Sequence, residues 1–173
     1  PGTTSLDGAT LVAALKDVVK EFARHGVRRI CLVNGHYENS WFIVEGIDLA
    51  LRELRWDGIT DLKVVVLSYW DFVHEDAIAR LYPDGFPGWA VEHGGVLETS
   101  LMLALHPRLV QLDRAVDIPP ATFPPYDVYP VKPEWTPAPG TLSSPKEASV
   151  EKGHLLLEVC TKGIVEALRA EFG

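Results

Sequence analysis

A histidine and a carboxylate stand two residues apart directly after an apolar stretch of the chain. His36 and Glu38 follow residues 30–33, which predict a buried strand, across the polar dipeptide Asn34-Gly35. Ligands of open α/β sheets bind outside the carboxyl ends of the strands, so this turn is a candidate site. Imidazole and carboxylate both suit zinc and manganese, and in an extended turn both side chains would point the same way. The alternative is a tight turn whose polar side chains simply meet water.

A second histidine stands before two glycines and a predicted helix. His93 precedes Gly94-Gly95 and the helical pattern of residues 96–105. Backbone N–H groups at a helix start favour an anionic ligand or transition state, so His93 is a candidate general acid or base. The alternative is a loop histidine with no partner, with Glu98 as a first-turn carboxylate that meets the helix dipole.

Tryptophans accompany both histidines. Trp70 follows the second predicted strand, where it either walls a pocket or plugs the strand end, and Trp89 lies four residues before His93. The remaining histidines have no second candidate ligand nearby and are expected to be structural: His25, His74, His106 and His154.

Helices and strands alternate along the chain. Alternation of this length implies parallel pairing through right-handed crossovers, and therefore a three-layer α/β/α fold with a mostly parallel sheet. The first helix is expected to follow a Thr4-x-x-Asp7 start signal and to close at Gly26, and the last to open at a Ser144-x-x-Glu147 capping box. The last helix is predicted at about 147–171. Between the first and last helices, the patterns predict strands at about 29–33 and 62–67, and helices at 42–54, 75–81 and 96–105.

Composition excludes several classes of protein. The 173 residues suit a single domain, 1–173, and a net charge of -8 without a basic run argues against nucleic acid and anionic membranes as partners. Cys31 and Cys160 lie in apolar settings without metal or redox spacing, which favours reduced thiols and a cytoplasmic protein. There is no Gly-x-Ser-x-Gly, Gly-x-Gly-x-x-Gly, phosphate-loop or Cys-x-x-Cys motif, so the commonest hydrolase, dinucleotide and NTPase sites are excluded.

Residues 118–145 form a proline-rich arm. They hold nine of the 13 prolines, too many for a helix or an inner strand, together with four aromatic residues: Phe123, Tyr126, Tyr129 and Trp135. A disordered linker is one interpretation. The aromatic residues favour the other, an ordered arm packed on its own domain or on a neighbouring subunit.

The combined motifs resemble the creatininase family of metal-dependent amidohydrolases. The resemblance rests on Asn34-Gly35-His36-Tyr37-Glu38-Asn39, on Glu92-His93-Gly94-Gly95 with Glu98-Thr99-Ser100-Leu101, and on Pro1-Gly2-Thr3-Thr4-Ser5-Leu6. It covers the whole chain, including residues 64–73 and 119–128. The Tyr37-Glu38 pair is more specific than the general pattern and resembles the bacterial members that act on creatinine.

The resemblance implies a homohexameric hydrolase that converts creatinine and water reversibly to creatine, with two Zn²⁺ or Mn²⁺ ions per subunit. A metal-bound hydroxide would attack the ring amide carbonyl, and an imidazole would protonate the departing nitrogen. The implied roles are metal ligands His36 and Glu38, with Glu38 also catalytic; proton donor His93; substrate contacts Tyr37, Trp70, His93 and Trp89, the last on a flap; and supporting carboxylates Glu92 and Glu98.

The chain departs from the family pattern in two ways. The family's Glu-x-His ligand pair and a bridging aspartate would lie on an amino-terminal segment, so the chain resembles a fragment that holds two of five ligands. Ala90 stands where an aspartate is expected, which puts one substrate contact in doubt. Two alternatives therefore stay open: a family member acting on another amide, such as a formamide or a lactam, and a non-catalytic fragment or assembly module.

Overall fold

The computed structural model describes residues 4–173 in two compact units. The first unit comprises the chain up to residue 71 together with residues 164–173, and the second comprises residues 72–163. Residues 1–3, which begin the amino-terminal motif of the resemblance, lie outside the described residues. The single domain expected over 1–173 stays a prediction, and the two units are described in turn.

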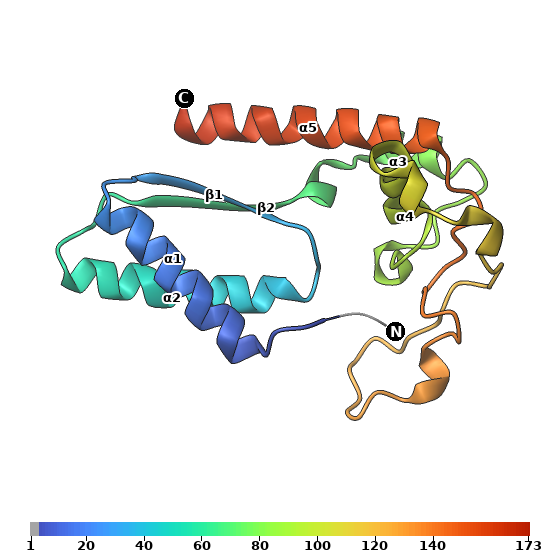
Figure 1. Ribbon diagram of the computed structural model, residues 1–173, viewed down its shortest axis with the longest axis horizontal. Coiled ribbons are helices and arrows are strands. Elements are labelled where there is room, and N and C mark those ends of the chain that lie inside the picture. The colour runs from blue at the N-terminus through green and yellow to red at the C-terminus, as the bar shows by residue number, and fades with distance from the viewer. Residues whose placement is uncertain (1–3) are drawn as a thin grey trace. The chain divides into compact units, whose positions relative to one another are not determined.

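The first unit is built on two parallel strands. Its elements are α1 (Gly8–Arg24), β1 (Arg29–Asn34), α2 (Asn39–Trp56) and β2 (Lys63–Ser68). The strands pair in parallel from Arg29 opposite Lys63 to Asn34 opposite Ser68. Figure 1 shows α1 and α2 on the same side of this pair. The expected α/β class with parallel strands is confirmed.

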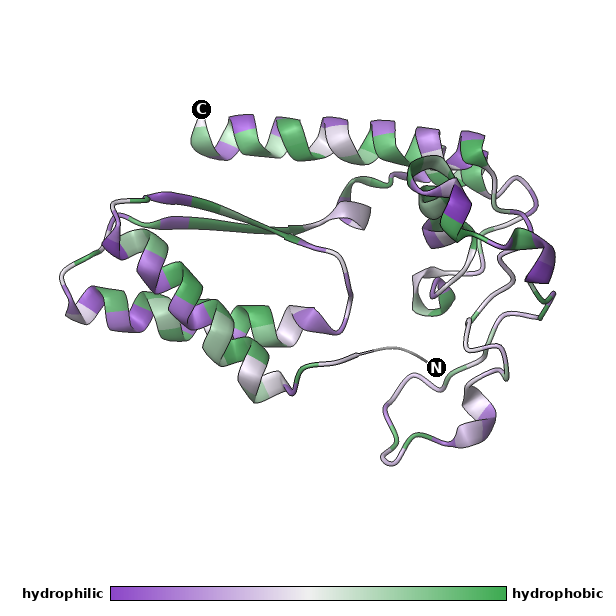
Figure 2. Cartoon of the chain, in the orientation of Figure 1, coloured by the Kyte–Doolittle hydropathy of each residue, from purple (hydrophilic) through white to green (hydrophobic). Residues whose placement is uncertain are grey.

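The core of this unit lies between the helices and the sheet. Val19 of α1, Ile30 of β1 and Ala50 of α2 are buried together. Helix α2 can approach α1 closely because Gly46 has no side chain; a Cβ there would lie 3.2 Å from the Val12 carbonyl oxygen. Both strands are hydrophobic over most of their length (Figure 2), yet Val33 is 58% exposed, so part of the sheet's apolar surface is open.

The ends of the helices correct two sequence predictions. Helix α1 begins at Gly8, directly after the expected Thr4-x-x-Asp7 signal, but the residue at its start is Asp7 and not Thr4, and Asp7 makes no side-chain capping bond within the described chain. Helix α5 (Val150–Phe172) begins later than expected, because Ser149 and not Ser144 caps it: Ser149 Oγ accepts a hydrogen bond from the Lys152 N–H over 3.2 Å. Capping signals in sequence locate a helix start only to within a few residues.

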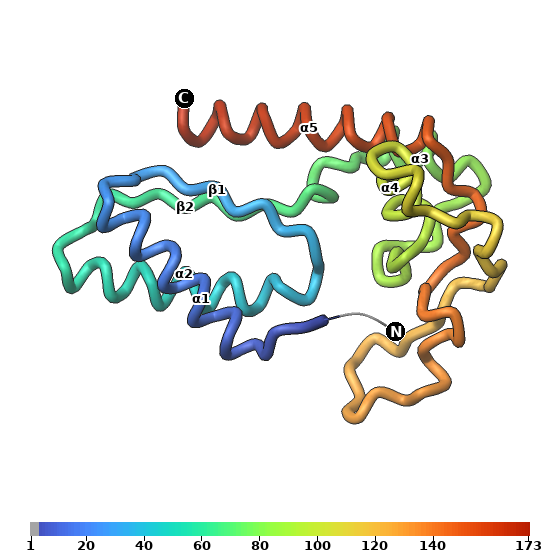
Figure 3. The backbone as a smooth tube through the Cα atoms, viewed as in Figure 1, coloured from blue at the N-terminus to red at the C-terminus, as the bar shows by residue number. Residues whose placement is uncertain are grey.

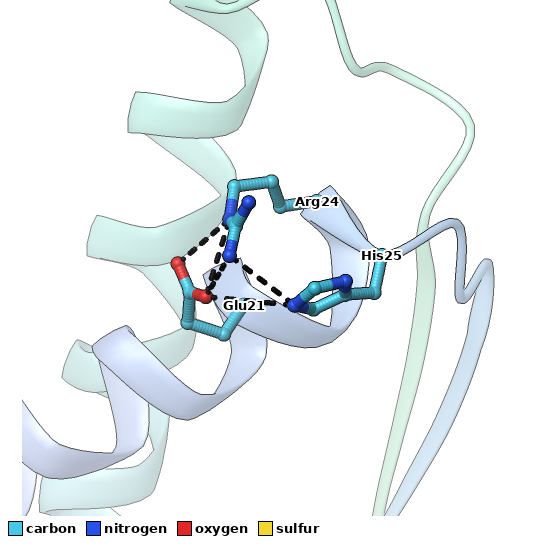
Figure 4. A network of polar contacts seen from close by, with 3 residues as sticks. All are labelled: Glu21, Arg24 and His25. Atoms are coloured by element: carbon cyan, nitrogen blue, oxygen red, sulfur yellow. Dashed lines mark hydrogen bonds and ion pairs between the residues drawn. The ribbon is translucent and has the colours of Figure 1, made fainter.

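The last turn of α5 belongs to the first unit and is attached to the starts of both strands. The Arg29 guanidinium donates to the Phe172 carbonyl, and Lys63 Nζ forms an ion pair with Glu171 Oε2 at 2.6 Å. At the carboxyl end of α1, an exposed network is formed by Glu21, Arg24 and His25, in which Arg24 Nη2 lies 2.7 Å from Glu21 Oε2 (Figure 4). Such surface pairs contribute little stability, and the structural role expected for His25 stays a prediction.

The second unit consists of short helices and long connections. Its elements are α3 (Glu75–Leu81), α4 (Val96–Leu105), the first part of α5, and the 3-10 turns Trp89–Val91, Pro107–Leu109, Leu112–Arg114 and Pro133–Trp135; another such turn, Tyr69–Phe72, joins the units in sequence. The bounds of α3 and α4 are those predicted. Leu81, Leu97 and Leu156 are fully buried, and a Cβ on Gly153 of α5 would lie 2.1 Å from the Ser100 carbonyl oxygen of α4. This glycine permits the two helices to pack closely.

The proline-rich arm of residues 118–145 runs as an open loop (Figure 3). Its two ends are joined by a hydrogen bond from the Ala121 N–H to the Leu142 carbonyl over 2.8 Å. Phe123 contacts Trp135 edge to face at 6.5 Å between ring centroids, whereas Tyr126 and Tyr129 are exposed. Among residues 4–173, no helix is long and apolar enough to cross a membrane.

Candidate functional site

Asn34 organises the turn at the carboxyl end of β1. Its side chain is buried; Oδ1 accepts hydrogen bonds from the His36 N–H at 3.1 Å and from Asn39 Nδ2 at 3.4 Å. Its Nδ2 donates to Ser40 Oγ at 3.3 Å and to Ser68 Oγ at 3.5 Å. One buried amide therefore connects both strand ends, the turn and the start of α2.

This turn brings His36 and Glu38 together. His36 Nδ1 lies 3.4 Å from Glu38 Oε2, and the side chains are 46% and 74% exposed. The sequence predicted an extended segment here. The structure instead has a tight turn, in which the Asn39 N–H donates to the His36 carbonyl over 3.2 Å. Glu38 has helical backbone angles, which turn its carboxylate back toward the imidazole. The pair forms through this turn rather than through strand alternation.

The His36–Glu38 pair offers two donors of the kind that bind zinc or manganese. Across residues 4–173, no group of three or more His, Cys, Asp or Glu side chains is arranged to hold a metal ion. The donor chemistry and the short separation of this pair are compatible with two ligands of a metal centre. Cys31 and Cys160 are free thiols, and burial raises the pKa of both.

Aromatic side chains stand beside the strand ends of the first unit. Tyr37 packs edge to face against Trp41 at 5.4 Å, and Tyr69 packs against Trp70 at 4.9 Å. The turn after β2 is closed by the Asp71 carboxylate, which accepts a hydrogen bond from the Ser68 N–H over 2.7 Å. Tyr37 and Trp70, both proposed from sequence, therefore each carry an aromatic neighbour that restricts the ring.

In the second unit, His93 lies in a loop whose backbone is held on both sides. Its carbonyl accepts a hydrogen bond from the Leu142 N–H over 3.0 Å, and the next N–H, of Gly94, donates to Glu98 Oε2. Gly94 has a φ of +64°, a conformation that favours glycine. The first-turn position of Glu98 is confirmed, and His93 is not a loop residue without partners.

The Glu92 carboxylate is partly buried and is held by two hydrogen bonds. Its Oε1 accepts a hydrogen bond from the Leu97 N–H over 2.7 Å, and its Oε2 accepts one from the Tyr82 hydroxyl. Burial is the main cause that raises the pKa of Glu92 above its usual range, and the nearby charge of Glu98 acts in the same direction. Burial likewise raises the pKa of Tyr82, so its hydroxyl stays protonated and able to donate.

Trp89 stands at the exposed edge of this group. It is 46% exposed and packs against Phe86 at 5.1 Å, and Phe86 packs in turn against Tyr82 at 4.9 Å. Gly88, just before it, has a φ of +107°, which only glycine adopts readily. Trp89 thus follows a glycine with positive φ, and about half of its surface is exposed.

Sequence reasoning missed three residues that shape these groups: Asn34, Tyr82 and Leu142. Asn34 had a local signal, because an asparagine at a strand end readily bonds the backbone two residues on. Tyr82 and Leu142 had none, since their partners Glu92 and His93 are reached only through the fold.

Comparisons with known proteins give a consistent result. The family model described as creatininase, creatinine amidohydrolase, matches residues 1–168. A creatinine amidohydrolase from Pseudomonas putida is 72% identical over 173 residues, which are 99% of this chain and 66% of that protein. A manganese creatininase structure (71% identity, TM-score 0.96) and a creatininase variant complexed with creatine (70%, TM-score 0.96) each cover 99% of this chain, and the chain covers 67% and 68% of theirs. The chain thus spans about two thirds of these relatives, and the TM-scores confirm the fold class.

Proposed function

Since the chain belongs to the creatininase family, we propose that it acts as a metal-dependent cyclic amidohydrolase that interconverts creatinine and creatine. The observation that carries this proposal is the approach of His36 Nδ1 to Glu38 Oε2 at 3.4 Å beyond the end of β1. The relative in complex with creatine supports the choice of substrate. Zinc and manganese are the proposed metals, because relatives of both kinds, Zn-Zn and Mn, have this fold.

His36 and Glu38 would hold the metal together with ligands from outside the described residues. When bound, such ions make a water nucleophilic near neutral pH and polarise the amide carbonyl. The turn built on Asn34 holds the backbone that carries both side chains, which reduces the ordering that binding requires. Glu38 is 74% exposed, so its second oxygen remains available to substrate or water.

The aromatic residues would bind the flat ring of the substrate. Tyr37, Trp70 and Trp89 each present a ring held by an aromatic neighbour, and such faces attract guanidino-type cations by stacking and cation–π contact. His93 would protonate the ring nitrogen as the C–N bond breaks, since an imidazole donates and accepts protons near neutral pH. Glu92 and Glu98 would support His93 through the backbone around it, because Glu92 accepts the Leu97 N–H and Glu98 accepts the Gly94 N–H.

The setting of the protein is part of the same proposal. Free thiols at Cys31 and Cys160 agree with a reducing, cytoplasmic environment. A homo-oligomer, with six subunits as the family resemblance implies, is the proposed assembly. The open apolar surface around Val33 supports a further covering element or subunit.

A second candidate follows from the donor count. Only two metal donors come together in the described residues, an arrangement that a non-catalytic assembly module would also show. Purified protein should be loaded with zinc or manganese, assayed for metal content, and tested side by side on creatinine, a formamide and a lactam. Turnover of creatinine supports the proposal, turnover of another amide alone redirects it, and metal binding below one ion per chain without turnover favours the module.

His93→Ala tests the assigned proton donor. Metal content should stay at the wild-type level while turnover falls by about 10²- to 10⁴-fold, the usual contribution of a positioned acid or base. His106→Ala, a change outside the proposed site, is the matched control. Unchanged turnover in His93→Ala would refute the role of His93, and a loss of metal would make it a ligand.

A further inference from the structure

Helix α4 lacks a capping side chain at its own start, and Glu92 supplies one. The residue before the helix is Gly95, which has no side chain to bond the free N–H groups of the first turn. Glu92 Oε1 accepts the Leu97 N–H over 2.7 Å instead. A carboxylate at this position also interacts favourably with the positive end of the helix dipole.

The other oxygen of Glu92 is held by Tyr82. The Tyr82 hydroxyl donates to Glu92 Oε2, and its ring packs on Phe86 at 4.9 Å. Gly95 leaves no spare room beside this oxygen, because a Cβ there would lie 2.6 Å from both Glu92 Oε2 and Ser143 Oγ. The carboxylate is thus fixed by two hydrogen bonds and by contact with the backbone.

Three consecutive residues of the loop are held by four hydrogen bonds to four other residues. The Glu92 side chain is attached to Tyr82 and Leu97, the His93 carbonyl to the Leu142 N–H at 3.0 Å, and the Gly94 N–H to Glu98. Among these four hydrogen bonds, the one from Tyr82 is donated by a side-chain hydroxyl, and Tyr82 lies outside both the loop and α4. His93 itself stays exposed at the surface of the unit.

We propose that Tyr82 and Glu92 are positioning residues for His93: the Tyr82 hydroxyl fixes the Glu92 carboxylate, which fixes the start of α4 and the loop backbone that carries the imidazole. The inference rests on the proposed function of His93 in proton transfer. Neither residue touches substrate in this scheme. A displaced reacting group can cost about 10²-fold in rate, so loss of the Tyr82 hydroxyl should reduce turnover without weakening substrate binding.

Tyr82→Phe in the intact, metal-loaded protein is the test, because it removes the hydroxyl and keeps the ring on Phe86. We expect kcat with creatinine to fall by roughly 10- to 100-fold, with KM and metal content unchanged and the pH profile of kcat shifted. Tyr129→Phe, which removes an 82% exposed hydroxyl, is the matched control and should match wild type. Glu92→Gln should retain more activity than Glu92→Ala, because an amide can still accept the Leu97 N–H.

A second measurement does not depend on turnover. Amide hydrogen exchange at Leu97 and Gly94 should be faster in Tyr82→Phe than in wild type, whereas a tyrosine that only fills space would leave both rates unchanged. Wild-type kcat and wild-type exchange in Tyr82→Phe would overturn the inference. If wild-type protein fails to hydrolyse creatinine, the proposed function fails, and the exchange rates alone then decide whether Tyr82 and Glu92 hold the loop.

Discussion

Asn34 and Ser68 are paired across the carboxyl ends of β1 and β2, and the Asn34 amide donates to Ser68 Oγ over 3.5 Å. The same amide accepts the His36 N–H, so the connection between the strands extends to the turn that carries the proposed metal ligands His36 and Glu38. One buried side chain therefore links the paired strand ends to the turn that holds His36 and Glu38.

Asn34→Ala should destabilise the protein and weaken the metal site. The change leaves the His36 N–H and the Ser68 hydroxyl without this partner, and lost buried hydrogen bonds of this kind cost about 1–3 kcal/mol. Urea denaturation measures the free energy of unfolding. Ser40→Ala, which removes only one of the acceptors of Asn34, is the control and should cost less. Equal stabilities of Asn34→Ala and wild type would contradict the role of Asn34.

His36→Ala and Glu38→Gln should each reduce metal affinity. Both variants remove one proposed ligand, so the loss should exceed the roughly 10- to 100-fold that changes outside the ligand shell produce. Metal content after dialysis against a graded chelator measures it. His25→Ala, a histidine in the exposed network with Glu21, should bind metal as wild type does. Retention of full metal by both site variants would rule out the proposed ligand pair.

The raised pKa of Glu92 predicts a specific pH dependence of stability. Because its folded-state pKa lies above the ordinary 4.5, the folded state binds the proton more tightly, and this contribution is lost as pH rises through the folded pKa. Wild type should therefore lose stability relative to Glu92→Gln as pH rises above 4.5, by about 1.4 kcal/mol for each unit of the shift. Denaturation at a series of pH values measures the difference, with exposed Glu166→Gln as control. A difference that stays constant with pH would show that burial does not perturb Glu92.

Gly95→Ala should destabilise the second unit. Its Cβ would lie 2.6 Å from Glu92 Oε2 and from Ser143 Oγ, closer than real contacts allow, so the carboxylate or the loop must move. Overpacking of this kind costs about 1–3 kcal/mol. At Gly35 nothing lies within 4 Å of an added Cβ, so Gly35→Ala is the matched control and should melt near the wild-type temperature. Indistinguishable melting of the two variants would mean that the loop has spare room.

Phe123→Ser combined with Tyr126→Ser should weaken assembly or thermal stability, because the arm would then lose the contact of Phe123 with Trp135 and the exposed ring of Tyr126. Size-exclusion chromatography and thermal melting of the intact protein measure the two effects. Tyr129→Ser, at a side chain that is 82% exposed, is the control. Wild-type behaviour of the double variant in both measurements would favour a solvated linker.

The sequence by itself determined the parts that depend on neighbouring residues. Sequence patterns predicted α3 and α4 with their observed bounds. The approach of His36 to Glu38 was also expected, but from an extended segment, whereas the structure brings the two side chains together through a tight turn. The sequence could not locate helix starts at Gly8 and Val150, because several capping residues compete within one turn of chain.

Only the tertiary structure decided which side chains support the site. The bonds of Tyr82 to Glu92 and of Leu142 to His93 join residues from separate segments, and no local propensity distinguishes such partners from other tyrosines and leucines. Buried polar groups must find partners wherever the folded backbone brings them, so packing selects these pairs after the elements have formed.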